Sequence, residues 1–262
     1  MHYVFPFLPP PWPPSSSGQA NRADYQCLSS RPDALKDKLI VVAYSGADPE
    51  RVDEGKMNRE SDQQPPRAVA FTSAMYLDVP DVAHVVLHTG LTVAVPSVHR
   101  KGILGELFAQ LFLHVVPLNP EGMWVTTLAA VFSSLVLSEK VLSKTYPCPP
   151  TRQGHRLLQP LPEHLAIARA IDERHRAQLL ISQDAEWDAE RFVFRGSMDW
   201  DAAEVFKKDA DDPKLWHRDK EATAFFGGLM RPGKGDEVLM VGFVDEERLR
   251  EGIAWQRQKS RM

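Results

Sequence analysis

Residues 91–107, LTVAVPSVHRKGILGEL, combine a strand, a short basic turn and a helix, and this order decides the fold prediction. Val93 and Val95 are β-branched and alternate with smaller residues, as in a strand, and the following proline ends that strand. Ile103 then begins an apolar stripe with helical period that runs to Val116. Because a helix start offers backbone N–H groups and a positive dipole end, the stretch predicts an anion site.

Length and composition indicate an ordinary globular protein. The chain has 262 residues, with a 43% apolar and a 25% charged share, enough for one large domain or two small ones. Its net charge of −4 provides no global basic field, so nucleic acid is not an expected partner. The most apolar stretch, 123–138, is shorter than a membrane span and predicts buried core rather than a membrane segment.

Cysteine and histidine usage predicts neither a disulfide framework nor a metal site. The chain holds two cysteines, Cys27 and Cys148, which favour reduced thiols in the cytoplasm, although a single disulfide remains an alternative. His84 and His88 are four residues apart, but they lie in the strand-like HVVLH, and no glutamate follows His84 as in a zinc protease. We therefore expect no metal.

The first 34 residues form a proline-rich tail and lead-in. The segment FPFLPPPWPPSSSG favours extended or disordered chain, and its prolines argue against a secretory signal. A docking peptide for a proline-binding partner is the alternative reading of this tail.

The remaining apolar runs predict a mixed sheet with flanking helices. Short linkers make the first three strands antiparallel, whereas the strands on either side of the first helix form a parallel pair with a right-handed crossover. Such a pair opens at its ends, where ligands commonly bind. The expected strands are 39–44, 68–76, 84–95, 124–128, 192–195 and 238–244; the expected helices are 103–116, 131–144, 162–178, 202–208, 220–226 and 245–259.

The basic turn and its flanks resemble the coenzyme A pyrophosphate loop of the GNAT N-acetyltransferases, which reads strand, Arg/Gln-x-x-Gly-x-Gly/Ala, helix. In this chain His99 takes the first position, Gly102 the central glycine and Leu104 the last, so the first and last positions depart from the pattern. The resemblance covers about 35–250 and is closest to fungal GNAT-like proteins, through LKDKLIVVAYSG, Tyr-Pro-Cys-Pro and Gly-Asp-Glu segments. The strand and two helices that normally open the domain are missing or replaced.

The resemblance implies an α/β (α+β) fold with a mixed, largely antiparallel sheet. It divides the chain into the tail 1–34, a GNAT-like core 35–150 and a C-terminal extension 151–262 packed on that core. It also implies acetyl-CoA or another acyl-CoA as co-substrate, with pyrophosphate on the turn and pantetheine along the preceding strand. The implied CoA-binding residues are Val93, Val95, His99, Arg100, Lys101, Gly102, Ile103, Leu104 and Gly105.

Two residues are candidates for acid–base catalysis. Neither 91–95 nor 124–128 contains a carboxylate, so the glutamate base common in the family has no match. His88 is the candidate base, although a lone histidine on a strand is more often structural. Tyr146 follows the second helix, near where the family often keeps a tyrosine acid for the departing thiolate.

Two functions follow as hypotheses. The first is a GNAT-fold acyltransferase that moves an acetyl or acyl group from acyl-CoA to a small amine or hydroxyl acceptor. The second is a GNAT-like protein with a degenerate CoA loop that binds or transforms another small molecule without acyl transfer. In either case we expect a small-molecule partner, no nucleic acid and no membrane; a homodimer is a further expectation.

Overall fold

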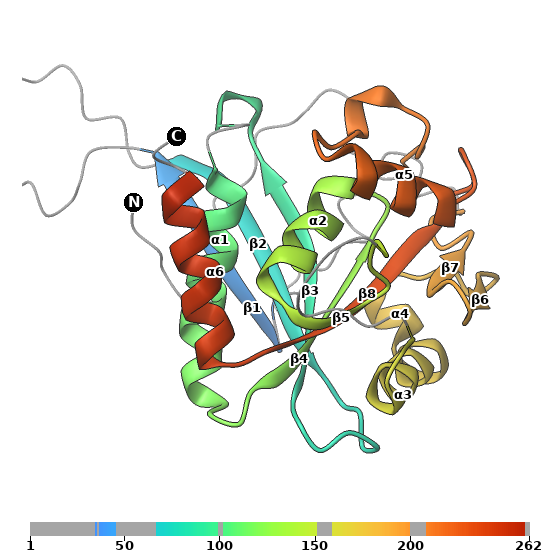
Figure 1. Ribbon diagram of the computed structural model, residues 1–262, viewed down its shortest axis with the longest axis horizontal. Helices are drawn as coiled ribbons and strands as arrows, with labels where there is room; N and C mark the ends of the chain where they lie inside the picture. The colour runs from blue at the N-terminus through green and yellow to red at the C-terminus, as the bar shows by residue number, and fades with distance from the viewer. Residues whose placement is uncertain are drawn as a thin grey trace, which may run out of the picture.

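The computed structural model describes residues 35, 37–45, 67–98, 102–150, 159–199 and 208–259. They form one eight-stranded, largely antiparallel sheet with helices on both faces (Figure 1). The strand order is β1-β2-β3-β4-β8-β7-β6, with β5 paired to β8 outside this path. The predicted fold class, a mixed α/β fold with a largely antiparallel sheet, is confirmed.

The first three strands form an antiparallel meander, as their short linkers predicted. These are β1 (Lys38–Ser45), β2 (Arg67–Leu77) and β3 (Val86–Ala94). The predicted loop between β1 and β2 falls mainly at 46–66, which lies outside the described residues.

A helix connects the two parallel strands of the sheet. Helix α1 (Ile103–Val115) follows β3 and leads to β4 (Met123–Ala129), which pairs parallel with β3. Along α1 the buried residues Ile103, Leu107 and Leu111 recur every four positions, which is the expected apolar face of an amphipathic helix. The strand–helix–strand unit predicted from the sequence is therefore present.

The remaining elements complete the sheet and both helical layers. Strand β8 lies between β4 and β7, and its alternate residues are buried against opposite layers. The strands are β5 (Ser143–Tyr146), β6 (Glu186–Asp188), β7 (Val193–Arg195) and β8 (Glu237–Val244). The helices are α2 (Phe132–Val141), α3 (Pro162–Ala170), α4 (Arg176–Leu179), α5 (Lys220–Leu229) and α6 (Glu246–Lys259), with short 3-10 turns at Pro96–Val98, Val116–Leu118 and Pro213–Leu215.

Each face of the sheet has its own helical layer and apolar core. Helices α1, α2, α5 and α6 cover one face, where Leu107, Phe132 and Phe226 are fully buried. Helices α3 and α4 cover the other face, joined by the π-helical turn η4 (Ile171–His175). Among the described binding and catalytic candidates, His88 and Val93 lie on β3, Ile103 to Gly105 begin α1, and Tyr146 ends β5.

Three local predictions need correction or fall outside the described chain. Helix α2 ends at Val141, not at Lys144, because the residues that follow pair with β8 as β5. The helical pattern of 162–178 predicts that Leu165 faces inward, but Leu165 of α3 is exposed. The predicted helix 202–208 lies almost wholly outside the described residues.

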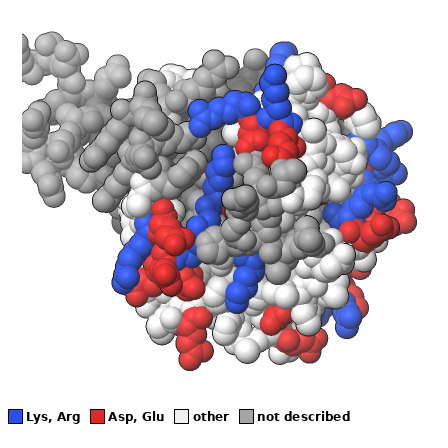
Figure 2. Space-filling view, viewed as in Figure 1, with Lys and Arg blue, Asp and Glu red and all other residues white. Residues whose placement is uncertain are grey.

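Charged side chains of both signs are interspersed over the face shown in Figure 2. They gather into no single-sign field there, in keeping with the small net charge. None of the described helices has both the length and the apolar character that crossing a membrane requires.

Candidate functional site

The parallel strands β3 and β4 separate in the middle of the sheet. Their ladder runs from Val86↔Trp124 to Thr89↔Thr127 and continues no further, although both strands extend beyond these residues. Beyond the last pair, β3 stays with β2 while β4 stays with β8. An opening between the two strands thus begins directly after Thr89 and Thr127.

A β-bulge in β3 lies at the opening. The register with β2 passes from Thr72↔Thr92 to Ala74↔Thr89, so Gly90 and Leu91 together face the single residue Ser73. Because a bulge bends its strand and increases the local twist, it turns β3 away from β4. The close contact requires glycine: a Cβ on Gly90 would lie 2.8 Å from the Ser73 hydroxyl, which donates to the Leu91 carbonyl at 3.2 Å.

A chain of hydroxyl groups runs from β3 through β4 to α2 at the last paired residues, on the α1/α2 face. Thr89 Oγ1 donates to the Thr126 carbonyl at 3.0 Å, so its proton is already committed. With Thr89 as donor to this carbonyl, Thr127 donates in its 2.7 Å contact with Thr89, and Ser138 donates in its 2.9 Å contact with Thr127. This order leaves the Ser138 oxygen as an acceptor toward a small cavity beneath α1 and α2, lined by Thr89 and Ser138.

His88 and Thr126 lie side by side on the opposite face. The His88 ring is buried, with 5% of the residue exposed, and its Nδ1 is 2.9 Å from Thr126 Oγ1. Burial, followed by the nearby charges of Lys38 and His175, lowers the pKa of His88 to about 3. His88 is therefore neutral at physiological pH and a weak base, so the environment does not support the role of general base.

The start of α1, the helix that connects β3 to β4, offers backbone donors. Gly102 precedes the helix with φ +76°, a conformation that glycine adopts without strain, and a Cβ there would meet no atom within 4 Å. The first intrahelical bond comes from Glu106 N to the Gly102 carbonyl, so the preceding N–H groups have no partner within the helix. Among the predicted CoA-binding residues, Ile103 is buried, whereas Leu104 is 38% exposed.

The other predicted CoA-binding residues have definite places relative to this helix start. Val93 lies on β3 beyond the bulge, and Val95 directly follows the strand, donating from its N–H to the Val69 carbonyl. Gly105 lies in the first turn of α1. His99, Arg100 and Lys101 lie outside the described residues.

Tyr146 ends β5 and lies far along the sheet from His88. The register aligns His88 with Thr126, Thr126 with Val241 and Val241 with Tyr146, so three strand spacings separate them. At about 4.8 Å per spacing the two backbones are about 14 Å apart. The Tyr146 hydroxyl donates to the Glu190 carbonyl at 3.3 Å, and burial, then Cys148 and Glu190, raise its pKa. The structure therefore does not bring the two catalytic candidates together.

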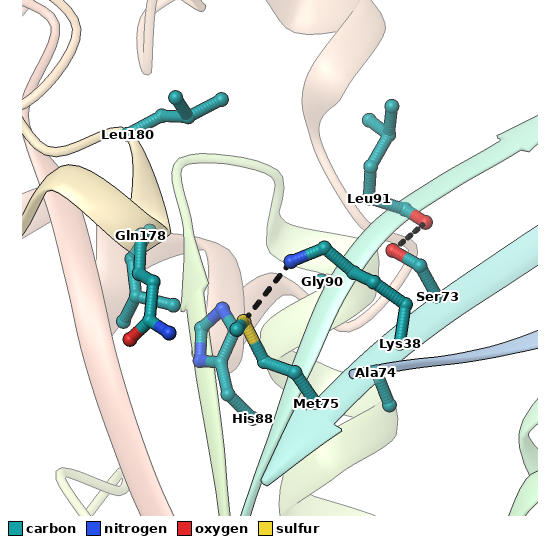
Figure 3. A pocket seen from close by; sticks show the side chains of 10 residues that line it. Lys38, Ser73, Ala74, Met75, His88, Gly90, Leu91, Gln178 and Leu180 are labelled. Atoms are coloured by element: carbon teal, nitrogen blue, oxygen red, sulfur yellow. Dashed lines mark hydrogen bonds between the residues drawn. The ribbon is translucent and has the colours of Figure 1, made fainter. Parts of the chain in front are cut away.

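A second cavity of about 70 Å3 opens beside His88, between the first three strands and the end of α4. Lys38 from β1 and Gln178 from α4 contribute to its wall (Figure 3). Sequence reasoning missed both residues, since each is a single polar residue within an amphipathic segment and only the fold brings them to His88.

No group of three or more His, Cys, Asp or Glu side chains within the described ranges is arranged to hold a metal ion. No family model, curated protein or solved structure matches the chain.

Proposed function

We propose that this protein transfers an acyl group from acyl-CoA to a small amine or hydroxyl acceptor. The observation that carries the proposal is the opening between β3 and β4, the two parallel strands that α1 connects, which begins after Thr89 and Thr127. The opening provides a path between two strands, and the start of α1 provides a cluster of backbone donors. A ligand with a long, amide-bearing arm and a pyrophosphate fits both features.

The two faces of the opening take different parts in this reaction. Acyl-CoA binds from the α1 side, with its pyrophosphate at the backbone N–H groups after Gly102 and its pantetheine arm along β3. The lone pair of Ser138, left open by the hydroxyl chain, accepts a hydrogen bond from an N–H of that arm. The acceptor approaches from the His88 face, where the second cavity lies.

The reaction itself is a direct displacement. The acceptor nitrogen or oxygen forms a bond to the thioester carbon, the carbon–sulfur bond breaks, and the acceptor proton ends on the CoA sulfur. Holding the two reactants in line supplies most of the rate increase, because it replaces a bimolecular encounter. The neutral His88 contributes by orienting the acceptor, and the reaction takes place in the cytoplasm.

Calorimetric titration with acetyl-CoA tests the proposal. We expect saturable binding to the full chain at micromolar to millimolar concentrations, and release of free CoA thiol when an acceptor is added. Gly102→Glu places a carboxylate at the pyrophosphate position and should weaken binding at least tenfold relative to Gly102→Gln, which adds similar bulk without charge. No binding to the unmodified protein at millimolar acetyl-CoA would contradict the proposal, as would equal affinity in the two variants.

The low pKa of His88 also favours a second candidate function. A neutral ring and the exposed Leu104 at the pyrophosphate position suit a protein that binds a small molecule without acyl transfer. This function predicts binding in the cavity beside His88 but no heat of binding and no thiol release with acetyl-CoA.

A further inference from the structure

The cavity beside His88 is walled by three strands and one helix. Lys38, Met75 and His88 come from β1, β2 and β3, and Gln178 comes from α4 (Figure 3). Its volume of about 70 Å3 is several times the cavity volume of about 10–15 Å3 that holds one water molecule, and suits a small functional group. The cavity therefore has room for part of a ligand rather than for an entire cofactor.

The unequal bonding of the buried histidines points to a ligand in this cavity. His164 accepts from Leu161 N at 2.8 Å and contacts the Lys144 carbonyl at 2.8 Å, so both ring nitrogens are bonded. Both nitrogens of His175 also have partners, at 2.7 and 3.0 Å. His88, by contrast, uses only Nδ1, and its Nε2 has no partner among the described residues. Nε2 of His88 borders the cavity, so a ligand there would supply its hydrogen-bond partner.

The contact between His88 and Thr126 determines which ring nitrogen of His88 carries the proton. Thr126 is fully buried, and among the described residues His88 Nδ1 is the acceptor within reach of its hydroxyl proton. Since a buried hydroxyl without an acceptor is costly, Thr126 donates and Nδ1 accepts. The proton of the neutral ring is then on Nε2, which presents an N–H donor to the cavity.

The other polar groups of the wall also suit an acceptor or anion. Lys38 brings a positive charge to the cavity, with its ammonium group 3.3 Å from the Met75 sulfur. Gln178 directs its amide oxygen to His175 at 2.7 Å, which leaves its NH2 group on the side of the cavity (Figure 3). No carboxylate is among the described residues that line it. The wall therefore combines one cation with neutral N–H donors.

We propose that this cavity binds the carboxylate of a small ligand, through the Lys38 ammonium and the His88 Nε2–H. The Lys38 ammonium and the N–H donors of His88 and Gln178 match the two acceptor oxygens of a carboxylate. Leu91, Leu179 and Leu180 supply apolar wall for a short aliphatic chain beside it. The carboxylate site does not depend on the proposed acyl transfer. The role of its ligand as acyl acceptor does rest on that proposed function.

The position of His88 relates the carboxylate to the opening. His88 immediately precedes Thr89, the residue at which the ladder between β3 and β4 ends. A carboxylate held at His88 thus places the next few atoms of its ligand at the opening. The acceptor class is a short amino acid or hydroxy acid, with its amine or hydroxyl within a few bonds of the carboxylate.

Titration without CoA tests carboxylate binding directly on the full chain. The probes are acetate and glycine, with acetamide and glycinamide as neutral matches of the same shape. We expect both carboxylates, and neither amide, to bind at millimolar concentration and to shift the His88 Nε2 signal in histidine-selective ¹⁵N NMR. Equal binding of acetate and acetamide, or binding without a response from His88, would overturn the inference.

Substitutions at Lys38 and His88 then distinguish a hydrogen bond from His88 to the ligand from a structural effect of losing either side chain. Lys38→Met and His88→Leu should each weaken acetate binding at least tenfold, whereas His88→Gln, which keeps an NH2 near the Nε2 position, should retain affinity within about threefold. Lys234→Met, on an exposed turn, is the matched control and should leave affinity unchanged. Unaltered binding in both Lys38→Met and His88→Leu would refute the assignment, and the selectivity of the unmodified protein remains decisive if a variant fails to fold.

The combined results distinguish this inference from the proposed function. Acetate binding without acetyl-CoA binding supports the carboxylate site and refutes acyl transfer. Acetyl-CoA binding without carboxylate selectivity refutes the site and leaves acyl transfer standing.

Discussion

Two adjacent threonines of β4 set the direction of hydrogen bonding on the two faces of the opening. Thr126 faces His88 and, by donating its only proton, makes the ring a donor at Nε2. Thr127 faces α2 and donates a hydrogen bond to Thr89, and Ser138 donates to Thr127, which leaves the Ser138 oxygen as an acceptor. Because neighbouring strand residues point to opposite faces, two residues of one type leave a ring N–H on one face and a hydroxyl acceptor on the other.

A second polar cluster orders the turn before β8. The carboxylate of Asp236 accepts from Gly196 N, Arg195 and Arg231 at 2.8 to 3.0 Å. Burial by itself raises the pKa of Asp236, but the bonds from Arg231, Gly196 and Arg195 lower it to about 2. A depressed folded-state pKa stabilises the fold above the ordinary value of 3.8, and this contribution is lost as the pH falls toward 2.

Glu237, the next residue, gives stability the opposite dependence on pH. Burial raises the pKa of Glu237 to about 7, partly opposed by the hydrogen bond from Ser197 at 2.6 Å. From pH 4.5 to 7 the folded chain holds a proton that the unfolded chain releases, so stability falls as the pH rises through this window. Glu237→Gln removes the ionisation and should raise the free energy of unfolding at pH 8 by about 1–3 kcal/mol.

Urea denaturation of both proteins at pH 4 and pH 8 provides the measurement. The free energies of unfolding of wild type and Glu237→Gln should be closest at pH 4, where wild-type Glu237 is protonated. They should differ most at pH 8. Glu121→Gln, on an exposed turn, is the control that should show no such divergence. A constant difference between Glu237→Gln and wild type at both pH values would contradict the assignment.

The bulge of β3 is the element that creates the opening, and Gly90 is the residue that permits it. Gly90→Ala places a Cβ 2.8 Å from the Ser73 hydroxyl and should break the bond from Ser73 to the Leu91 carbonyl. We expect a loss of about 1–2 kcal/mol of stability, together with weaker ligand binding at the opening. Thermal unfolding and the acetate titration measure the two effects.

A double mutant tests whether Ser73 is the cause. In a Ser73→Ala background the clash is absent, so Gly90→Ala should cost about 1 kcal/mol less than in the unmodified chain. Gly228→Ala, on the exposed side of α5 with nothing near its Cβ, should instead stabilise by about 0.5–1 kcal/mol. If the stability effects of Ser73→Ala and Gly90→Ala were additive, the contact between these residues would not explain the loss of stability caused by Gly90→Ala.

Elements with a strong local pattern could be predicted from the sequence, and elements that depend on distant pairing could not. Sequence patterns alone predict the apolar runs of β1 and β8 and the apolar residues that recur every four positions in α1. The end of α2 could not be placed, because β5 forms only against β8, about a hundred residues later. Likewise His88 was recognised as a candidate, but its neutral state depends on burial and on Lys38, which no local pattern reveals.

On the scale of the whole molecule, the C-terminal third supplies the centre of the sheet. Strand β8 pairs with β4 from Met123↔Val244 to Ala129↔Val238, and also holds β5 and β7. At Gly242 the β5 segment lies so close that a Cβ would meet Leu142 at 2.7 Å and Thr145 at 2.8 Å. The site on β3 and β4 is therefore supported by residues far beyond the segment that first suggested it.

This arrangement predicts that residues 1–150 do not fold without the remainder of the chain. Truncation after 150 removes β8, exposes one edge of β4 along its whole length and uncovers the apolar residues that face α3 and α6. We expect the fragment to show no cooperative thermal transition and no binding of either ligand, whereas co-expression with 151–262 should restore both. A cooperative transition in the isolated fragment, by circular dichroism and amide hydrogen exchange, would show instead that β1 to β5 form a core independent of β8.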